Sequence, residues 1–122
     1  MIQLLLHLLG DYFLQNDWMA TNKRKWTLEG WVACVIHCLL YAIPFGIYYN
    51  PTVCLLVYST HILVDKFCLA KYFTMLINWN WEDENFGFNE MIPAYLTTWL
   101  HIIMDNSLHI ACNYFIILYF TK

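Results

Sequence analysis

The order of apolar and polar positions divides the chain into four long apolar segments separated by short polar stretches. The segments cover residues 1 to about 20, about 26 to 49, about 51 to 78 and about 93 to 120. Each is close to or above the roughly 20 residues that an α-helix needs to cross the hydrocarbon core of a bilayer. The pattern therefore predicts an all-α, polytopic membrane protein with about four transmembrane helices in one compact bundle.

The first segment is the least regular, because polar side chains interrupt it at a four-residue step at His7, Asp11 and Gln15. This step predicts one polar stripe along a helix. Two aspartates within the segment, Asp11 and Asp17, leave three placements open. The segment spans the bilayer, inserts half-way or lies in the interface.

A short turn signal joins the second and third segments. Asn50 and Pro51 leave room only for a tight antiparallel connection between two helices. Pro44 lies inside the second segment and is a position at which that helix could kink.

Composition supports a membrane environment and excludes one class of partner. Of the 122 residues, 61% are hydrophobic and only 12% are charged, whereas soluble domains average about 25% charged residues. The formal net charge is -3, and the only basic run, Lys23-Arg24-Lys25, is too short for a nucleic-acid footprint. Its place beside an apolar segment favours a membrane-flanking anchor instead. The sequence therefore predicts a single membrane-embedded domain over residues 1–122, with the lipid bilayer as its partner and no nucleic-acid binding.

The same basic run predicts the orientation of the chain. Because Lys and Arg are enriched in cytoplasmic loops, the 21–27 loop is expected in the cytoplasm. An even number of spans then puts the 79–92 loop on the same side, with its Trp79 and Trp81 at the interface and its acidic residues Glu82, Asp83 and Glu84 in water. The expected location is an inner or plasma membrane, crossed several times.

Five cysteines lie within the apolar segments, and none forms a C-x-x-C pair. We interpret them as buried small hydrophobic residues rather than disulfide partners. Cys34 and Cys38 share a helix face beside His37, so a thiolate metal ligand stays open as an alternative.

Ionisable side chains recur at one depth in the four segments. His7 and Asp11, His61 and Asp65, and His101 and Asp105 form three H-x-x-x-D pairs, and His109 extends the last pair by one more helical turn. Members of each pair share a helix face. An aspartate at the centre of a membrane helix costs about 2.5 to 3.5 kcal/mol, so three of them need compensating partners.

A shared metal site would compensate them. Bundle-core sites draw carboxylates and imidazoles from several helices, and mixed ligands of this kind suit Zn, Mn or Fe. The candidate ligands for one or two divalent ions are His7, Asp11, His61, Asp65, Asp105 and His109. The alternative is that each pair satisfies itself by hydrogen bonds between helices; a common depth favours the metal site, because self-satisfied pairs do not require it.

Four further polar residues complete the candidate site. His37 and His101 are candidates for the general acid or base, and Lys66 and Gln15 for contacts to an anionic substrate. Alternatives stay open for the last two residues, because Lys66 could snorkel to the surface and Gln15 could belong to the polar end of a helix.

A resemblance accompanies this reading. The string HLLGDYFLQNDWMA over residues 7–20, followed by Lys23, resembles an uncharacterised family of short bacterial and phage integral-membrane proteins, a domain of unknown function. Further matches are His37, the H-x-x-x-D-K of residues 61–66, and the D-x-x-x-H of residues 105–109. The resemblance implies a membrane architecture and these polar positions, but no activity. More distantly, the chain is similar to membrane-bound metal-dependent hydrolases, although their Thr-His-Ser element is absent.

Three functions follow as hypotheses. The first is a membrane-embedded metal-dependent hydrolase of a phosphoester or other small anionic substrate, reached from the cytoplasmic side. The second is a channel or a proton or ion carrier lined by His and Asp pairs, which requires a homo-oligomer because four helices are few for a pore. The third is a phage or host interaction protein whose polar cluster only fixes the bundle.

Overall fold

Every regular element in the described part of the computed structural model is a helix, which confirms the all-α prediction. The structure describes residues 1–82 and 84–121, so Asp83 of the predicted acidic loop lies outside it. The elements are α1 (Ile2–Leu8), the π-helix η1 (Leu9–Phe13), α2 (Asp17–Asn22), α3 (Leu28–Tyr48), α4 (Pro51–Lys66), α5 (Leu69–Asn78), the 3-10 helix η2 (Glu84–Gly87) and α6 (Ala94–Phe120).

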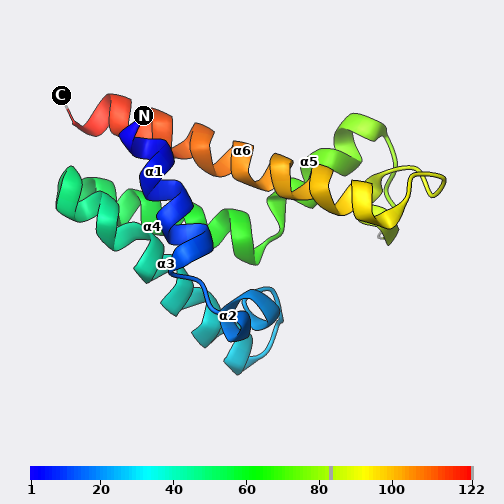
Figure 1. The fold of residues 1–122 in the computed structure, drawn as a ribbon, viewed down its shortest axis with the longest axis horizontal. Helices are drawn as coiled ribbons and strands as arrows, with labels where there is room; N and C mark the ends of the chain where they lie inside the picture. The colour runs from blue at the N-terminus through cyan, green and yellow to red at the C-terminus, as the bar shows by residue number, and fades with distance from the viewer. Residues whose placement is uncertain (83, 122) are drawn as a thin grey trace.

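An antiparallel hairpin of α3 and α4 is the centre of the bundle (Figure 1). Asn50 accepts a hydrogen bond from the Val53 N–H and Pro51 takes the first helical position, so the predicted tight connection is confirmed. Pro44 lies inside α3, which is unbroken over residues 28–48.

The other helices pack on this hairpin. α6 lies along α4, and α1 crosses over α3 and α6 (Figure 1). The turn at Asn50 lies at the end of the bundle that holds both chain termini, and the Asn50 side-chain amide donates to the Phe120 carbonyl at 3.0 Å. At the other end, α2 with the start of α3 diverges from α5, η2 and the start of α6 (Figure 1).

The first predicted segment is not one helix to residue 20. It forms the short apolar helix Ile2–Phe13, and helical structure resumes only at Asp17. The break has a local cause, because Asn16 adopts an extended backbone and its side chain accepts a hydrogen bond from the Met19 N–H. This is the geometry of an N-cap, which begins a new helix.

The third predicted segment is also broken. α4 ends at Lys66, and α5 leaves at an angle of 58° after Phe67 and Cys68. Cys68 has a left-handed backbone, with φ of 51°, which cannot continue an α-helix. The segment is therefore a bent pair of helices.

Two or three helices among the described residues are long and apolar enough to cross a membrane. They are α3, α6 and, if the bent pair is counted as one span, α4 with α5. The outer surface is rich in large exposed apolar side chains, such as Leu28, Ile47 and Tyr95, whereas His37, His61 and other polar side chains are buried. This polar-inside and apolar-outside arrangement fits a lipid surrounding better than water.

An apolar cluster fills the bundle at the end with the termini. Its buried members are Tyr41, Ala42, Phe45, Val53, Val57 and Ile116. The polar side chains of the candidate site begin directly beyond this cluster, because Tyr41 belongs to the cluster and also stacks on His61 at a centroid distance of 3.7 Å.

Candidate metal centre

The helices bring three histidines to one level of the bundle. His37 lies eleven residues before the end of α3, His61 ten residues after the start of α4, and His109 eleven residues before the end of α6. At 1.5 Å of rise per residue, all three lie roughly 15 to 17 Å from the end with the termini. The helix lengths thus set a common depth for side chains that are far apart in the sequence.

Asp11 reaches the same level from the π-helix η1. The Leu14 N–H bonds to the Leu9 carbonyl, five residues back, at 3.0 Å. Such π-turns recur at functional sites, where they re-aim a side chain. The neighbouring Gly10 lies directly against Tyr41 of α3, where a Cβ would overlap the ring. The close approach of η1 and α3 therefore depends on Gly10.

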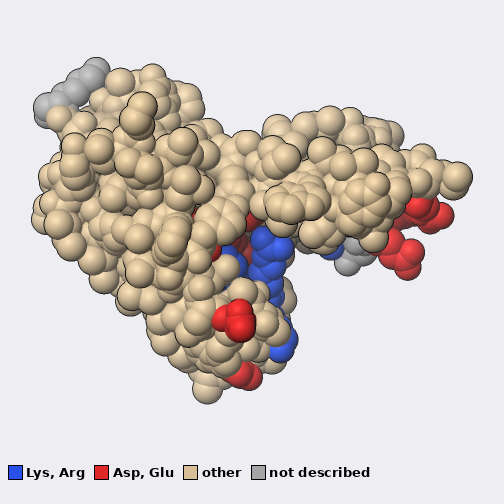
Figure 2. All heavy atoms as spheres, viewed as in Figure 1, with Lys and Arg blue, Asp and Glu red and all other residues tan. Residues whose placement is uncertain are grey.

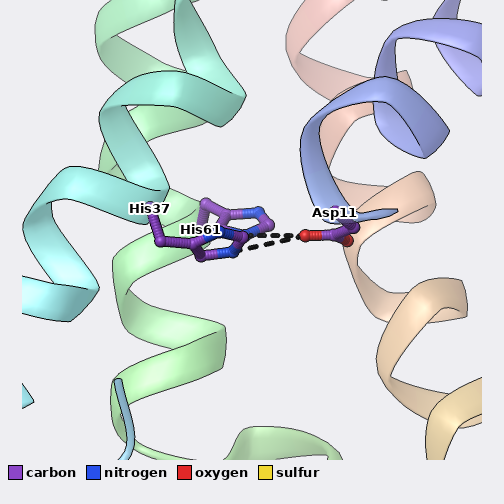
Figure 3. A group of neighbouring side chains, drawn as sticks. All are labelled: Asp11, His37 and His61. Atoms are coloured by element: carbon purple, nitrogen blue, oxygen red, sulfur yellow. Dashed lines mark hydrogen bonds and ion pairs between the residues drawn. The ribbon is translucent and has the colours of Figure 1, made fainter. Parts of the chain in front are cut away.

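Four donor atoms converge between α3, α4 and η1, and we call them the central donor group. They belong to Asp11, His37, His61 and Asp65. The two imidazole Nε2 atoms lie 3.0 Å apart, each lies 3.3 Å from Asp11 Oδ1, and they lie 3.2 and 3.5 Å from Asp65 Oδ2. Figure 3 shows both imidazoles pointing at the Asp11 carboxylate.

These spacings match a coordination polyhedron. A tetrahedron with metal–ligand bonds of about 2.0 to 2.1 Å has edges of about 3.3 to 3.4 Å. Asp11 Oδ1 is buried and accepts no hydrogen bond within the described residues, whereas the buried Asp65 Oδ2 is paired with the Lys23 ammonium at 2.6 Å. A buried acceptor without a donor is costly, so a cation between the imidazoles is the partner that the chemistry of Asp11 Oδ1 calls for.

The imidazole nitrogens of His37 and His61 that face away from the donor group have no hydrogen-bond partner among the described residues. Both of these Nδ1 atoms are buried. Metal-binding histidines usually donate this N–H to an oxygen, which fixes the tautomer and strengthens binding. The donor atoms of the central donor group are therefore well spaced for a metal, but the two histidines lack the hydrogen bonds that would orient their rings.

A second donor group shares Asp65. His109 Nε2 lies 3.3 Å from Asp65 Oδ1 and 3.9 Å from Asp105 Oδ2. These three side chains meet the spacing for a metal site. Because Asp65 turns one oxygen to each group and is fully buried, its carboxylate is placed to bridge two ions. Cys38 gives a further combination with His61 and Asp65, which keeps the thiolate alternative open.

His7 lies beside the donor groups rather than within them. Its Nδ1 lies 2.7 Å from the Tyr41 hydroxyl and 3.4 Å from Asp11 Oδ2, and its Nε2 lies 2.8 Å from Asn106 Oδ1. The Tyr41 hydroxyl also accepts a hydrogen bond from the Asn113 amide at 2.6 Å. This network ties Asp11 to α3 and α6.

Two cationic side chains from the loop after α2, those of Lys23 and Arg24, pair with carboxylates of the donor groups. Lys23 Nζ lies 2.6 Å from Asp65 Oδ2, and the Arg24 guanidinium lies 3.5 Å from Asp105 Oδ2 and 3.2 Å from His101 Nε2. Burial acts to lower the pKa of Lys23, but attraction to carboxylates, above all that of Asp65, outweighs it and raises the pKa above its ordinary value. Lys23 therefore stays charged beside Asp65.

Lys66 holds that loop in place. Its ammonium is buried and donates to the backbone carbonyls of Lys25 at 2.6 Å and Lys23 at 3.3 Å. It also lies 4.4 Å from the centroid of the Trp31 ring, within cation–π range. Gly30 permits the close packing, because a Cβ there would overlap the Lys25 carbonyl.

A cleft of about 410 Å³ leads to the donor groups from the diverging end of the bundle. Figure 2 shows basic and acidic side chains together in the hollow at this end, where α2 and the start of α3 diverge from α5, η2 and the start of α6. The lining comes from η1, α2 with the loops on either side of it, η2 and α6, and it includes Asp11, Gln15, Lys23, Arg24, His101 and Asp105. The ring of Phe86 stacks on His101 at a centroid distance of 4.4 Å and forms one wall.

A family model described as "Protein of unknown function (DUF3307)" matches residues 1–122. The chain belongs to this family. The predicted resemblance to an uncharacterised family is thereby confirmed over the whole chain. No curated protein and no solved structure matches the chain. The family description assigns no activity, so the geometry of the site carries the functional argument.

Most of the residues singled out in this DUF3307 sequence come together. Five of the six candidate ligands lie in the donor groups, namely Asp11, His61, Asp65, Asp105 and His109. The sixth, His7, lies next to these groups. His37, expected as an acid or base, stands in the central donor group. His101 and Gln15 line the cleft, whereas the Lys66 ammonium faces backbone carbonyls.

Sequence reasoning missed Lys23, Arg24 and Tyr41. The basic run was interpreted as a membrane-flanking anchor, because three adjacent cations beside an apolar segment are typical of one. Lys23 does follow the family string at residues 7–20, and this position was the available signal. Tyr41 carried no signal, because an aromatic residue in an apolar helix is usually packing.

Proposed function

We propose that the protein is a membrane-embedded metal-dependent hydrolase that acts on a phosphoester or another anionic substrate. The observation that carries this proposal is the spacing of the central donor group, in which five distances between donor atoms fall between 3.0 and 3.5 Å. Two imidazoles and two carboxylates suit Zn, Mn or Fe. The bridging position of Asp65 supports a second ion.

A bound divalent ion would supply a water molecule with its pKa lowered toward neutrality and a Lewis acid for a phosphoryl oxygen. The side chains of the protein would hold and orient the metal ligands. Tyr41 would hold His7, and His7 would orient Asp11 through the contact of its Nδ1 with Asp11 Oδ2. His37 acts as a ligand rather than as an acid or base, because its Nε2 faces both carboxylates.

The cleft residues would handle the substrate. His101 is our candidate for the general acid or base, because it lines the cleft and its Nδ1 is a buried atom without a hydrogen-bond partner among the described residues. Gln15 also lines the cleft, and its Oε1 is likewise buried without a hydrogen-bond partner among the described residues, so Gln15 would contact the substrate. Lys66 would act through the loop that it holds, by fixing the backbone of Lys23 and Lys25.

We further propose that the protein lies in an inner or plasma membrane with four apolar segments in the bilayer. The first would enter as α1 and η1, and the third as the bent pair α4 and α5. The 21–27 and 79–92 loops would face the cytoplasm, in agreement with the basic run at Lys23. The cleft opens toward these loops, so a substrate would enter from the cytoplasmic side.

The channel alternative is less well supported. A path through one chain would have to continue from the donor groups to the end with the termini, and that region holds the apolar cluster around Phe45, Val53 and Val57. A cleft open at one end suits a binding or catalytic site. Conduction would therefore need a path between copies in a homo-oligomer.

Metal analysis of the purified protein tests the proposal. The wild type, reconstituted in turn with Zn, Mn and Fe and passed through a desalting column, should retain about one or two ions per chain. His61→Ala should lose the central ion and Asp65→Asn should lose every ion, whereas His101→Ala and Asp17→Asn, which remove the same chemical groups outside the donor groups, should retain them. Circular dichroism and size exclusion would show that each variant is folded.

Turnover is the second readout. The loaded wild type should hydrolyse p-nitrophenyl phosphate or its diester faster than the chelated protein, and the ligand variants should not. A wild type that retains none of the three metals would overturn the metal site, and a loaded protein inactive on both esters would overturn the phosphoester reading.

A further inference from the structure

Two neighbouring loop residues each pair with one carboxylate of the donor groups. Lys23 lies 2.6 Å from Asp65 Oδ2, and Arg24 lies 3.5 Å from Asp105 Oδ2. Asp65 Oδ2 is the same oxygen that faces the imidazoles of His37 and His61. The loop cations and a divalent ion would therefore use the same carboxylates.

Both cations also line the cleft. They share its lining with His101 and Asp105, both of which the Arg24 guanidinium contacts. The Arg24 side chain is 35% exposed, and its Nε is a buried donor without a hydrogen-bond partner among the described residues. A free guanidinium donor beside an ammonium is the arrangement that binds phosphate-like oxyanions.

The charge of the cluster changes sign when a metal binds. With the histidines counted as neutral, the carboxylates of Asp11, Asp65 and Asp105 and the two loop cations, Lys23 and Arg24, together carry one net negative charge. A single divalent ion reverses this to one net positive charge, and a second ion adds two more. A cleft that repels an anion would then attract one.

We propose that Lys23 and Arg24 form a metal-dependent oxyanion site, in which they pair with Asp65 and Asp105 until divalent ions take those carboxylates and then bind a phosphate group in the cleft. The proposal rests on the metal site of the proposed function and adds the chemistry of its ligand. The ligand is a tetrahedral oxyanion, either free phosphate or the phosphate of a lipid head group.

The other lysines of this region do not share the role. Lys25 Nζ donates to the Asn22 side chain at 2.7 Å, and Lys66 Nζ donates to backbone carbonyls. Neither forms an ion pair with a donor-group carboxylate among the described residues. Lys25 is therefore a matched control, because it lies in the same loop and carries the same charge.

Two affinities test the proposal. Zinc affinity would be measured by competition with a chromophoric chelator, and the affinity of inorganic phosphate for the zinc-loaded protein by titration calorimetry, both in phosphatidylcholine nanodiscs. Lys23→Met removes the competing cation, so zinc should bind on the order of tenfold tighter. The same variant should bind phosphate on the order of tenfold more weakly. Arg24→Met should change both affinities in the same directions.

Opposite changes in the two affinities are the signature, because a residue that only supports the fold would weaken both. Lys25→Met should leave both unchanged, and Lys23→Arg, which keeps the charge, should resemble the wild type. Zinc binding that is unchanged or weaker in Lys23→Met overturns the exchange of partners while the metal site stands. Wild type and Lys25→Met that both fail to bind zinc overturn the metal site itself.

The source of the oxyanion is settled by a lipid arm. Nanodiscs that contain phosphatidic acid would be compared with pure phosphatidylcholine ones. If the cleft takes a lipid phosphate, phosphatidic acid should compete with inorganic phosphate in the wild type and less so in Arg24→Met. Undiminished phosphate binding in both nanodiscs would support free phosphate, and phosphate binding by the metal-free protein equal to that of the loaded protein would overturn the metal dependence.

Discussion

The Nε2 atoms of His37 and His61 lie 3.0 Å apart, although one imidazole comes from the middle of α3 and the other from the last turns of α4. Two neutral imidazole nitrogens that face each other with their lone pairs need a proton or a cation between them. Both atoms also lie 3.3 Å from Asp11 Oδ1. A metal satisfies all three atoms at once, whereas a single proton satisfies only one pair.

Metal binding should stabilise the fold through this pair. A ligand that binds only the native state at a concentration of 1,000 times its Kd adds about 4 kcal/mol. We expect zinc to raise the thermal midpoint of the wild type, followed by the tryptophan fluorescence of the detergent-solubilised protein. His61→Ala should abolish the increase, and His101→Ala should preserve it. The same increase in His61→Ala would place the stabilising ion elsewhere.

Stoichiometry should separate the two donor groups. Asp65 turns one oxygen to each group, whereas Asp105 belongs only to the second. Asp65→Asn should therefore lose every ion, and Asp105→Asn should lose at most the second ion and keep the one between His37 and His61. Elemental analysis of both variants at equal metal exposure measures this difference. Equal losses in the two variants would contradict a bridging Asp65.

The hydroxyl of Tyr41 should matter more for the site than its ring does for packing. It lies 2.7 Å from His7 Nδ1 and accepts the Asn113 amide at 2.6 Å. Tyr41→Phe would leave the buried Asn113 amide without this acceptor, at a cost of about 1 to 3 kcal/mol, and would leave His7 Nδ1 with Asp11 alone. We expect a lower thermal midpoint and weaker zinc binding, because His7, which contacts Asp11, would lose its anchor on α3.

The control for this prediction is Tyr48→Phe, in which the same hydroxyl is removed from an exposed residue at the end of α3. It should change neither quantity. A Tyr41→Phe protein that melts lower but binds zinc as tightly as the wild type would reduce the network to a structural role.

The parts of the fold that the sequence predicted are those that local periodicity governs. The second and fourth apolar segments became α3 and α6 with ends within about two residues, the usual uncertainty of a helix boundary. The H-x-x-x-D spacing placed His61 and Asp65 on one face, and similar distances from the helix ends put His61 level with His37.

The parts that it missed depend on contacts between distant segments. Cys68 bears none of the usual signs of a helix end, yet its left-handed backbone ends α4. Lys66, which immediately precedes this break, donates to the Lys25 carbonyl, and that contact brings the basic loop against α4. Lys23 can then reach Asp65. None of these contacts leaves a periodic trace, so a run of three basic residues was interpreted as an anchor.

A glycine in η1 offers a test of geometry without touching a ligand. Gly10→Ala would push a methyl group into the Tyr41 ring and move η1 away from α3. Overpacking of this kind costs about 1 to 3 kcal/mol. Because Asp11 is the next residue, we expect zinc affinity to fall as well as the thermal midpoint, measured by chelator competition and fluorescence melting.

Gly46→Ala is the matched control. Its methyl group would meet Cys54 where α3 and α4 pack, on the side of the apolar cluster and away from the donor groups. Overpacking there should lower the thermal midpoint by a similar amount and leave zinc affinity unchanged, because Asp11, His37 and His61 keep their positions. If the two variants lose zinc affinity equally, the loss reflects stability alone. If only Gly10→Ala loses it, the approach of η1 to α3 sets the position of the Asp11 carboxylate.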